Sequence, residues 1–173
     1  TSYRPTRNDT FSGYLAYMVA EYVSFPGASD NLHSADTMYN IFAPILGYAA
    51  IPSASADYSG KRLTNAPQFS ARFSYAHSFD LASGGKITPS VDFYAQSKTF
   101  ASSDNAVQGR IAGYTKTDLN LRYDEPSGHA YINLFMNNVE DRRIATTVVP
   151  VWSSTTASYA PPRTYGVRIG FKY

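Results

Sequence analysis

The sequence predicts an all-β protein, an antiparallel transmembrane β-barrel, and two observations carry this prediction. The first is the final stretch, in which odd positions from Tyr165 are apolar or aromatic and even positions are Gly, Arg, Gly and Lys. Only a β-strand places alternate residues on opposite faces in this way. The second is the composition, with 15 Tyr, 10 Phe and 16% charged residues, against about 25% charged residues in soluble domains. A soluble sandwich could use such a strand, but an apolar row that reaches Tyr173 is typical of the closing strand of an outer-membrane barrel.

The composition also excludes several classes of protein. A net charge of +2 without a block of like charges argues against a nucleic-acid partner. No apolar run approaches the roughly 20 residues of a membrane helix, so a helical membrane protein is excluded. The 173 residues include no Cys, which is compatible with a bacterial envelope protein. The chain starts at Thr1 with neither Met nor a signal segment, so we expect a processed or truncated product.

Taken in order along the chain, alternation with a period of two predicts six strands. They cover residues 12–25, 68–79, 87–98, 118–123, 130–137 and 165–173. The first alternates imperfectly. Pro89 predicts a bulge or the beginning of the third strand, because proline cannot donate a ladder hydrogen bond. Between the first two strands, residues 37–51 are apolar enough to pack on something or to form a short helix.

The predicted connections alternate between long and short. Residues 82–85 and 125–128 contain the Gly and Ser typical of tight turns. Residues 26–65, 101–113 and 143–160 form much longer segments. Outer-membrane barrels have short periplasmic turns and long extracellular loops. We therefore expect a periplasmic C-terminus and three extracellular loops.

The polar faces of the predicted strands carry too many charges for a packed core. These charges are Arg72, Asp92, Lys98, Asp118, Arg122, Arg168 and Lys172. Because an unpaired buried charge costs several kcal/mol, we expect a lumen that is wide and wet or filled by a plug. Six strands leave two open edges, which lipid does not tolerate. Either the chain is part of a larger barrel, or residues 38–50 supply missing strands of a small eight-stranded barrel.

Three motifs resemble those of one family. Residues 60–67, Gly-Lys-Arg-Leu-Thr-Asn-Ala-Pro, resemble the G-x-x-L-x-x-A-P segment that precedes a late strand of TonB-dependent outer-membrane receptors. Residues 134–143 resemble the penultimate strand of these receptors, and residues 162–173 resemble their closing strand. The motifs stand in the family's order, and the resemblance covers residues 56–173 well.

This resemblance implies that residues 1–173 are the C-terminal portion of a receptor barrel, the last six or so of roughly 22 strands. The plug, the TonB box that binds TonB, and the earlier strands would lie outside the sequence. The family implies active transport of a ferric siderophore, haem, cobalamin or a glycan across the bacterial outer membrane, energised through TonB. The implied partners are the remainder of the receptor, the TonB complex, the barrel-assembly machinery, outer-membrane lipid and lipopolysaccharide. The alternative is a self-contained eight-stranded barrel with a structural or adhesin role.

Aromatic and polar residues of the long connections are the candidates for solute contact, because binding residues concentrate on loops. They are Tyr39, Tyr48, Arg110, Trp152 and Tyr159. Alternatively, these side chains pack the loops together or lie among lipid headgroups, as Trp and Tyr often do.

The closing strand also resembles the C-terminal signal that the barrel-assembly machinery recognises by strand addition. The residues concerned are Thr164, Gly166, Ile169, Phe171 and Tyr173. Alternatively, they only face lipid. Nearby, Asn137, Asn138 and Asp141 are expected to satisfy backbone groups of a turn rather than to bind a ligand.

No catalytic site is predicted. His33, His77 and His129 lack the spacing of metal ligands. The sequence contains no G-x-S-x-G, phosphate-loop or G-x-G-x-x-G motif. We therefore expect neither an enzyme nor a cofactor or metal ion. A soluble lipid-binding barrel is disfavoured as well, since it needs apolar residues inside a smaller lumen.

Overall fold

The computed structural model describes residues 2–29, 42–48, 55–151 and 154–171 of the chain. Its main element is an eight-stranded antiparallel sheet with the order β1-β2-β5-β7-β10-β11-β14, in which β6 also pairs with β7. The strands are β1 (Ser2–Tyr3), β2 (Asp9–Tyr17), β5 (Phe69–His77), β6 (Phe79–Asp80), β7 (Lys86–Gln96), β10 (Tyr114–Asp124), β11 (Ala130–Asn137) and β14 (Thr164–Phe171). The long strands β2, β5, β7, β10, β11 and β14 correspond to the predicted ones, so the all-β antiparallel fold is confirmed.

The register of the sheet divides its residues between two faces. Leu119 of β10 lies opposite Val91 of β7 and Met136 of β11. One position away, Asp118 lies opposite Asp92 and points to the other face. The division continues along every long strand, so one face is apolar and the other polar. Large exposed side chains of the apolar face include Phe73, Phe93, Leu121, Leu134, Val167, Ile169 and Phe171.

Pro89 lies inside β7, and its effect differs from the predicted bulge or strand start. The pairing of β7 with β10 runs without a break along the whole of β7, so there is no bulge. The pairing with β5 stops at Ala76 and resumes, as β6, at Phe79. The missing N–H of proline thus coincides with a gap in one of the two ladders only.

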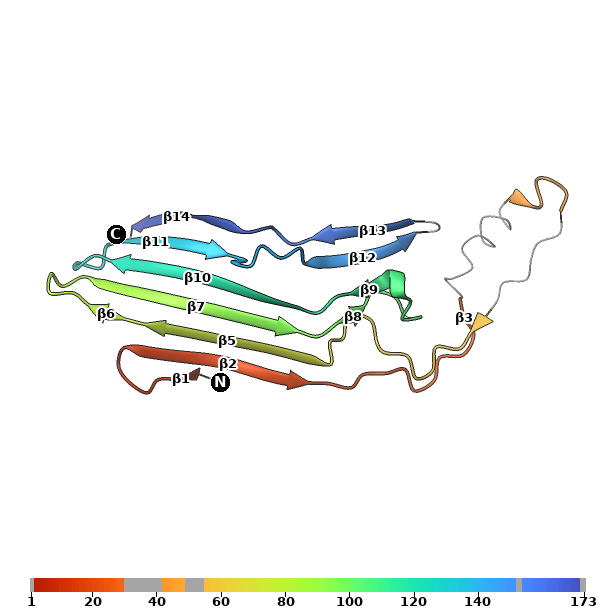
Figure 1. Ribbon diagram of the computed structural model, residues 1–173, viewed down its shortest axis with the longest axis horizontal. Helices are drawn as coiled ribbons and strands as arrows, with labels where there is room; N and C mark the ends of the chain where they lie inside the picture. The colour runs from red at the N-terminus through yellow and green to blue at the C-terminus, as the bar shows by residue number, and fades with distance from the viewer. Residues whose placement is uncertain (1, 30–41, 49–54, 152–153, 172–173) are drawn as a thin grey trace.

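The long connections leave the sheet at one end, and the short turns lie at the other (Figure 1). Each long connection contains a short pair of strands, and the second also contains a 3₁₀ helix. They are β3 (Ala28–Ser29) with β4 (Ser55–Ala56), β8 (Thr99–Phe100) with β9 (Arg110–Ile111), the 3₁₀ helix η2 (Val107–Gly109), and β12 (Ala145–Val151) with β13 (Ser154–Tyr159). Because β12 contacts both η2 and β9, the second and third connections pack against each other.

The hairpin β12–β13 occupies most of residues 143–160, which the sequence predicts as a loop. At its base Ile144 and Val148 are buried, as is Ile111 of β9 in the neighbouring connection. The hairpin is therefore stabilised by contacts with a neighbouring connection, which no local pattern encodes.

The first long strand is shorter than predicted. β2 ends at Tyr17 rather than at residue 25. Beyond it the chain pairs irregularly, with an isolated bridge between Glu21 and Arg62. Residues 42–48 form a helical turn, in which the Leu46 N–H donates to the Phe42 carbonyl. The rest of the apolar stretch 37–51 lies outside the described residues.

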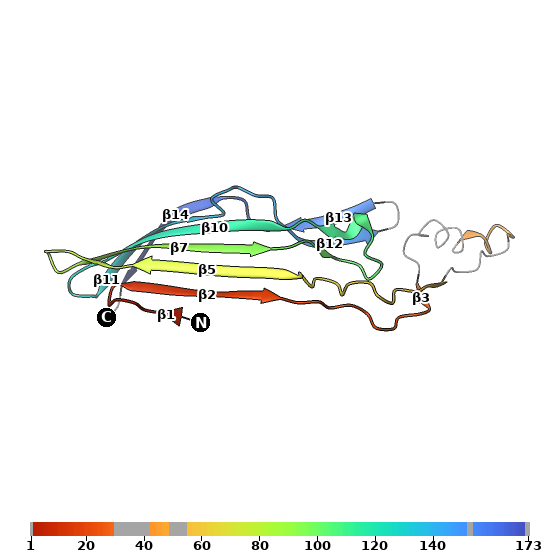
Figure 2. The ribbon, with the colours of Figure 1, turned by 60° about the horizontal axis from the view of Figure 1, so that its bottom comes forward.

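The sheet is curved and its described strands do not close on themselves (Figure 2). β1 and β2 lie at one edge and β14 at the other. Such edges present unpaired N–H and C=O groups. Over the described ranges, no helix has the length and hydrophobicity needed to cross a membrane.

Candidate functional site

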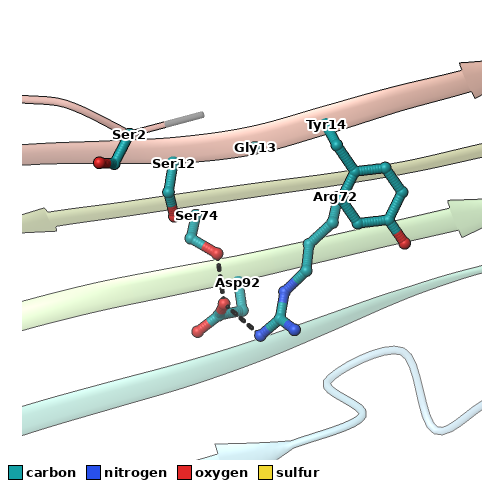
Figure 3. A pocket seen from close by; sticks show the side chains of 7 residues that line it. All are labelled: Ser2, Ser12, Gly13, Tyr14, Arg72, Ser74 and Asp92. Carbon is teal, nitrogen blue, oxygen red and sulfur yellow. Dashed lines mark hydrogen bonds and ion pairs between the residues drawn. The ribbon is translucent and has the colours of Figure 1, made fainter.

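The polar face of the sheet brings charged side chains together where β2, β5 and β7 run side by side. The Arg72 guanidinium lies 3.0 Å from the Asp92 carboxylate, and Ser74 Oγ donates a hydrogen bond to the same carboxylate oxygen. This ion pair lies in a hollow of the face (Figure 3). The hollow is lined by Ser2, Ser12, Gly13, Tyr14, Arg72, Ser74 and Asp92. It therefore presents an internally neutralised pair rather than a free charge.

Two further ion pairs lie along β10. Lys116 Nζ is 2.8 Å from Asp118, and the Arg122 guanidinium is 2.6 Å from Asp124. The partners of each pair are two residues apart and so share the polar face. Both pairs are partly exposed, as expected for a wet surface rather than a packed core.

Two aromatic rings of β11 lie flat against glycines of β14. A Cβ atom at Gly166 would be 2.9 Å from Phe135 Cζ, and one at Gly170 would overlap the ring of Tyr131. The Arg168 guanidinium stacks on Phe135 at 4.3 Å from the ring centroid. These glycines therefore admit the rings, and the polar face near β14 is formed by stacked arginine and aromatic side chains.

Side chains connect the first two long connections just beyond the sheet. Asn105 Nδ2 donates to the Arg62 carbonyl at 2.9 Å, while Asn105 Oδ1 accepts the Arg62 N–H at 2.7 Å. The Tyr22 hydroxyl lies 3.1 Å from Ser103 Oγ. The Arg62 guanidinium also lies over the Phe100 ring. The bases of these connections are thus joined by specific polar contacts.

The chain turns after β11 at Asn138 and Asp141, which have positive φ angles of 54° and 53°. Asn138 is 2% exposed, and its side chain bonds both the N–H and the carbonyl of Arg142. Asp141 Oδ1 accepts the N–H of Arg163. The predicted role of Asn138 and Asp141 at a turn is confirmed. Asn137 instead bonds a side chain of β14.

The described solute-contact candidates lie in different long connections, two of which pack against each other. Arg110 belongs to β9, and Tyr159 ends the β12–β13 hairpin that packs beside β9. Tyr159 is 56% exposed and Arg143 lies over its ring. Tyr48, in the described segment 42–48, is 62% exposed. Tyr39 and Trp152 fall outside the described residues.

The predicted assembly signal divides between the two faces of β14. Ile169 and Phe171 lie on the apolar face and are 63% and 72% exposed. Gly166 lies on the polar face against Phe135, and Thr164 is the first residue of β14. Tyr173 falls outside the described residues. Within the described sheet β14 pairs with β11 alone.

The sequence pattern predicts Arg72 and Asp92 as lumen charges but does not show that they pair. The period-two alternation that puts both residues on the polar face is visible in the sequence. The register between the neighbouring strands β5 and β7, which brings the two side chains together, is not. His77 lies on the apolar face with its Nδ1 2.6 Å from Asp9 Oδ1. Among the side chains that the structure describes, no group of His, Cys, Asp and Glu could hold a metal ion.

Comparison with known proteins gives a likeness of fold. No family model matches the sequence, and no curated protein matches it. Among solved structures, the ferric yersiniabactin uptake receptor FyuA from Yersinia pestis aligns with 99% of this chain at 17% identity and a TM-score of 0.72. The siderophore receptor PiuA from Acinetobacter baumannii aligns with 99% at 16% identity and a TM-score of 0.66. BauA, the ferric preacinetobactin receptor of the same organism, aligns with 66% at 19% identity and a TM-score of 0.54.

The chain spans only part of each of these structures, 22% of FyuA, 20% of PiuA and 16% of BauA. At these identities the likeness concerns the fold. The sheet therefore has the fold of part of these three receptor structures.

Proposed function

We propose that this chain forms part of the barrel wall of a TonB-dependent receptor in the outer membrane of a Gram-negative bacterium. The observation that carries the proposal is the division of one sheet into an exposed apolar face and an ion-paired polar face, with all long connections at one end. Lipid would cover the apolar face, and the polar face would line a lumen.

The proposed solute is a ferric siderophore. The names of the three similar structures support this class, since each is a siderophore receptor or a receptor for a ferric siderophore. Haem, cobalamin and glycans are the competing solutes. Energy would come from the TonB complex acting on the plug, and no enzymatic step is needed.

The proposed orientation places the short turns in the periplasm and the long connections outside the cell. The C-terminus would then be periplasmic, because β14 runs from the long-connection end towards the short-turn end. The remaining partners are the plug and other strands of the receptor, the barrel-assembly machinery acting on β14, and lipid with lipopolysaccharide around the apolar face.

Uptake by the intact receptor tests the proposal. We would express the full receptor in a Gram-negative strain that lacks its own ferric-siderophore receptors and measure accumulation of ⁵⁵Fe-siderophores. Accumulation is expected only with the receptor and only in cells that have TonB. Accumulation of cobalamin or haem alone would overturn the solute class, and accumulation independent of TonB would overturn the mechanism.

The contribution of Tyr159 to solute contact can be measured in the same receptor. Tyr159→Ala removes an exposed aromatic side chain of the long-connection end, and we expect roughly tenfold weaker siderophore binding. Tyr17→Ala is the matched control, because Tyr17 is an equally large exposed aromatic on the apolar face. Equal siderophore affinities of the two variants would contradict a contact between Tyr159 and the solute.

The alternative, a self-contained eight-stranded barrel, needs strands within residues 38–50. The described part of that stretch, 42–48, is a helical turn. The denatured intact mass of the polypeptide purified from membranes separates the two proposals. A mass well above 19.0 kDa is expected for the receptor, and a single species at 19.0 kDa would favour the small barrel.

A further inference from the structure

The ion pair of Asp9 with His77 lies on the apolar face of the sheet. Asp9 is the first residue of β2 and His77 the last of β5, and the two lie opposite each other in the ladder. The His77 Nδ1 is 2.6 Å from Asp9 Oδ1, and the Tyr75 hydroxyl donates to the same oxygen at 2.8 Å. The Thr6 hydroxyl donates to Asp9 Oδ2. The Asp9 carboxylate is therefore satisfied by its own chain.

The second ring nitrogen of His77 is left for another molecule. Because a carboxylate only accepts hydrogen bonds, the proton on Nδ1 faces Asp9. Within the described part of the chain Nε2 forms no hydrogen bond, and the side chain is 29% exposed. The ring packs on Phe79 with centroids 4.3 Å apart, which holds it in place. A protonated ring therefore offers Nε2 as a positioned donor for an anion.

The ion pair lies where hydrocarbon would give way to lipid headgroups. Phe69 and His77, the two ends of β5, both belong to the apolar face, and eight residue steps separate them. At about 3.3 Å a step they are roughly 26 Å apart, or about 20 Å along the membrane normal after strand tilt, close to the roughly 25 Å of an apolar band. Phe11 and Tyr75 stack beside the pair at 4.5 Å, as aromatic residues do at a membrane interface.

The turn before Asp9 carries two exposed arginines, Arg4 and Arg7. Neither has an acidic partner among the residues that the structure describes. The turn lies at the short-turn end of the sheet (Figure 1). It is fixed beside β5, because the Ser78 N–H donates to the Asn8 carbonyl at 2.8 Å. Two unpaired cations thus outweigh the single carboxylate of Asp9 at this rim.

We propose that this rim binds the phosphodiester of an anionic phospholipid, with His77 Nε2, Arg4 and Arg7 as donors. The inference rests on the proposed function, which places the apolar face in a membrane. Cations at a membrane surface attract anionic lipid, and an arginine can donate two parallel N–H bonds to a phosphate. A lipid is favoured over free phosphate, because its acyl chains also cover the apolar surface that includes Phe11 and Tyr75.

Lipid binding by the intact receptor tests this site. The purified receptor, freed of lipid in detergent, is titrated with phosphatidylglycerol or phosphatidylcholine, and bound lipid is counted by native mass spectrometry. We expect tighter binding of phosphatidylglycerol, whose headgroup has a net negative charge. Arg4→Gln and Arg7→Gln should each weaken its binding roughly fivefold. Lys86→Gln is the matched control, because Lys86 lies at the same end but already pairs with Asp80 at 3.5 Å.

A histidine variant tests the third donor. His77→Phe keeps an aromatic ring beside Phe79 and removes Nε2, and it should weaken phosphatidylglycerol binding roughly tenfold. His129→Phe is its control, because His129 is exposed in the turn between β10 and β11 at the same end of the sheet. If His77→Phe does not fold, the two arginine variants, which leave the ion pair intact, still decide the question.

The outcomes separate this inference from the proposed function. Equal affinity for the two lipids, or unchanged phosphatidylglycerol binding in the arginine variants, would overturn the site. Displacement of the lipid by an equal concentration of glycerol phosphate would overturn a lipid as the occupant. Loss of lipid selectivity with normal siderophore uptake counts against this inference alone. The expected selectivity in a receptor that takes up no siderophore supports this site and contradicts the proposed solute.

Discussion

At the scale of single residues, asparagine and aspartate at positive φ organise the connections. Asn65, Asn105, Asn138 and Asp141 have φ angles of 54°, 55°, 54° and 53°. Short polar side chains tolerate this region because they can bond nearby backbone groups. Asn105, Asn138 and Asp141 each form such bonds with an arginine backbone. These residues therefore fix where the chain leaves and re-enters the sheet.

Asn138 gives the sharpest prediction at this scale. Asn138→Ala removes its hydrogen bonds to the Arg142 backbone and places a β-carbon without polar compensation at positive φ, and we expect the receptor to lose about 2–4 kcal/mol of stability. Urea unfolding in detergent measures the loss. Asn137→Ala, which removes one exposed side-chain bond, should change stability by less than about 1 kcal/mol.

A second Asn138 variant separates the two causes. Asn138→Gly removes the same hydrogen bonds but accepts positive φ without strain. It should therefore be more stable than Asn138→Ala and less stable than wild type. Equal stability of Asn138→Gly and wild type would contradict the role assigned to the hydrogen bonds.

Glu140 gives a prediction for pH dependence. Partial desolvation raises the pKa of its carboxyl, but hydrogen bonds from the Thr117 hydroxyl and N–H, at 2.6 and 2.9 Å, outweigh this and hold the pKa below its ordinary value. A lowered folded-state pKa contributes stability above the unfolded-state value, about 4.3, which is lost as pH falls through the folded-state value. Calorimetry from pH 7 to pH 3 should show a smaller acid destabilisation for Glu140→Gln than for wild type. Identical profiles would count against this contribution.

At the scale of elements, the alternation along the strands was readable because side chains on a strand point to opposite faces with a period of two. Each long strand and both tight turns could therefore be predicted locally. The start of β10 could not be predicted locally. β10 begins at Tyr114, four residues before the predicted 118, because residues 114–117 join the sheet by pairing with β7. The β12–β13 hairpin was missed for the same reason, since its partners lie in another connection.

Paired substitutions on β10 test the assignment of the two faces. Leu119 lies on the apolar face near the middle of the strand, and its neighbour Asn120 lies on the polar face. Leu119→Lys should cost about 2–4 kcal/mol of folding free energy in vesicles, because it places a charge in lipid. Asn120→Lys should cost much less, since its side chain points into the lumen. A larger cost for Asn120→Lys would reverse the assignment.

At the scale of the whole molecule, the sheet is a curved wall with two edges, one exposed apolar face and one polar face. The polar side shows how far the sequence could define a site. The sequence pattern identified Arg72, Asp92, Asp118, Arg122 and Arg168 as facing one lumen. It did not show which of these side chains form ion pairs. A shift of one residue between β5 and β7 would separate Arg72 from Asp92, and only the three-dimensional register excludes it. The connections that carry Arg110 and Tyr159 pack against each other for a similar reason, which local sequence does not show.

Spin-label accessibility along β11 in the intact, membrane-embedded receptor tests the central claim most directly. Because this chain has no Cys, labels can be attached at single introduced cysteines from 130 to 137. We expect collision with oxygen, which concentrates in lipid, to be frequent at positions 130, 132, 134 and 136 and infrequent at positions 131, 133, 135 and 137. Uniform accessibility, or a maximum at the odd positions, would contradict the assignment of this sheet to a barrel wall with its apolar face in the membrane.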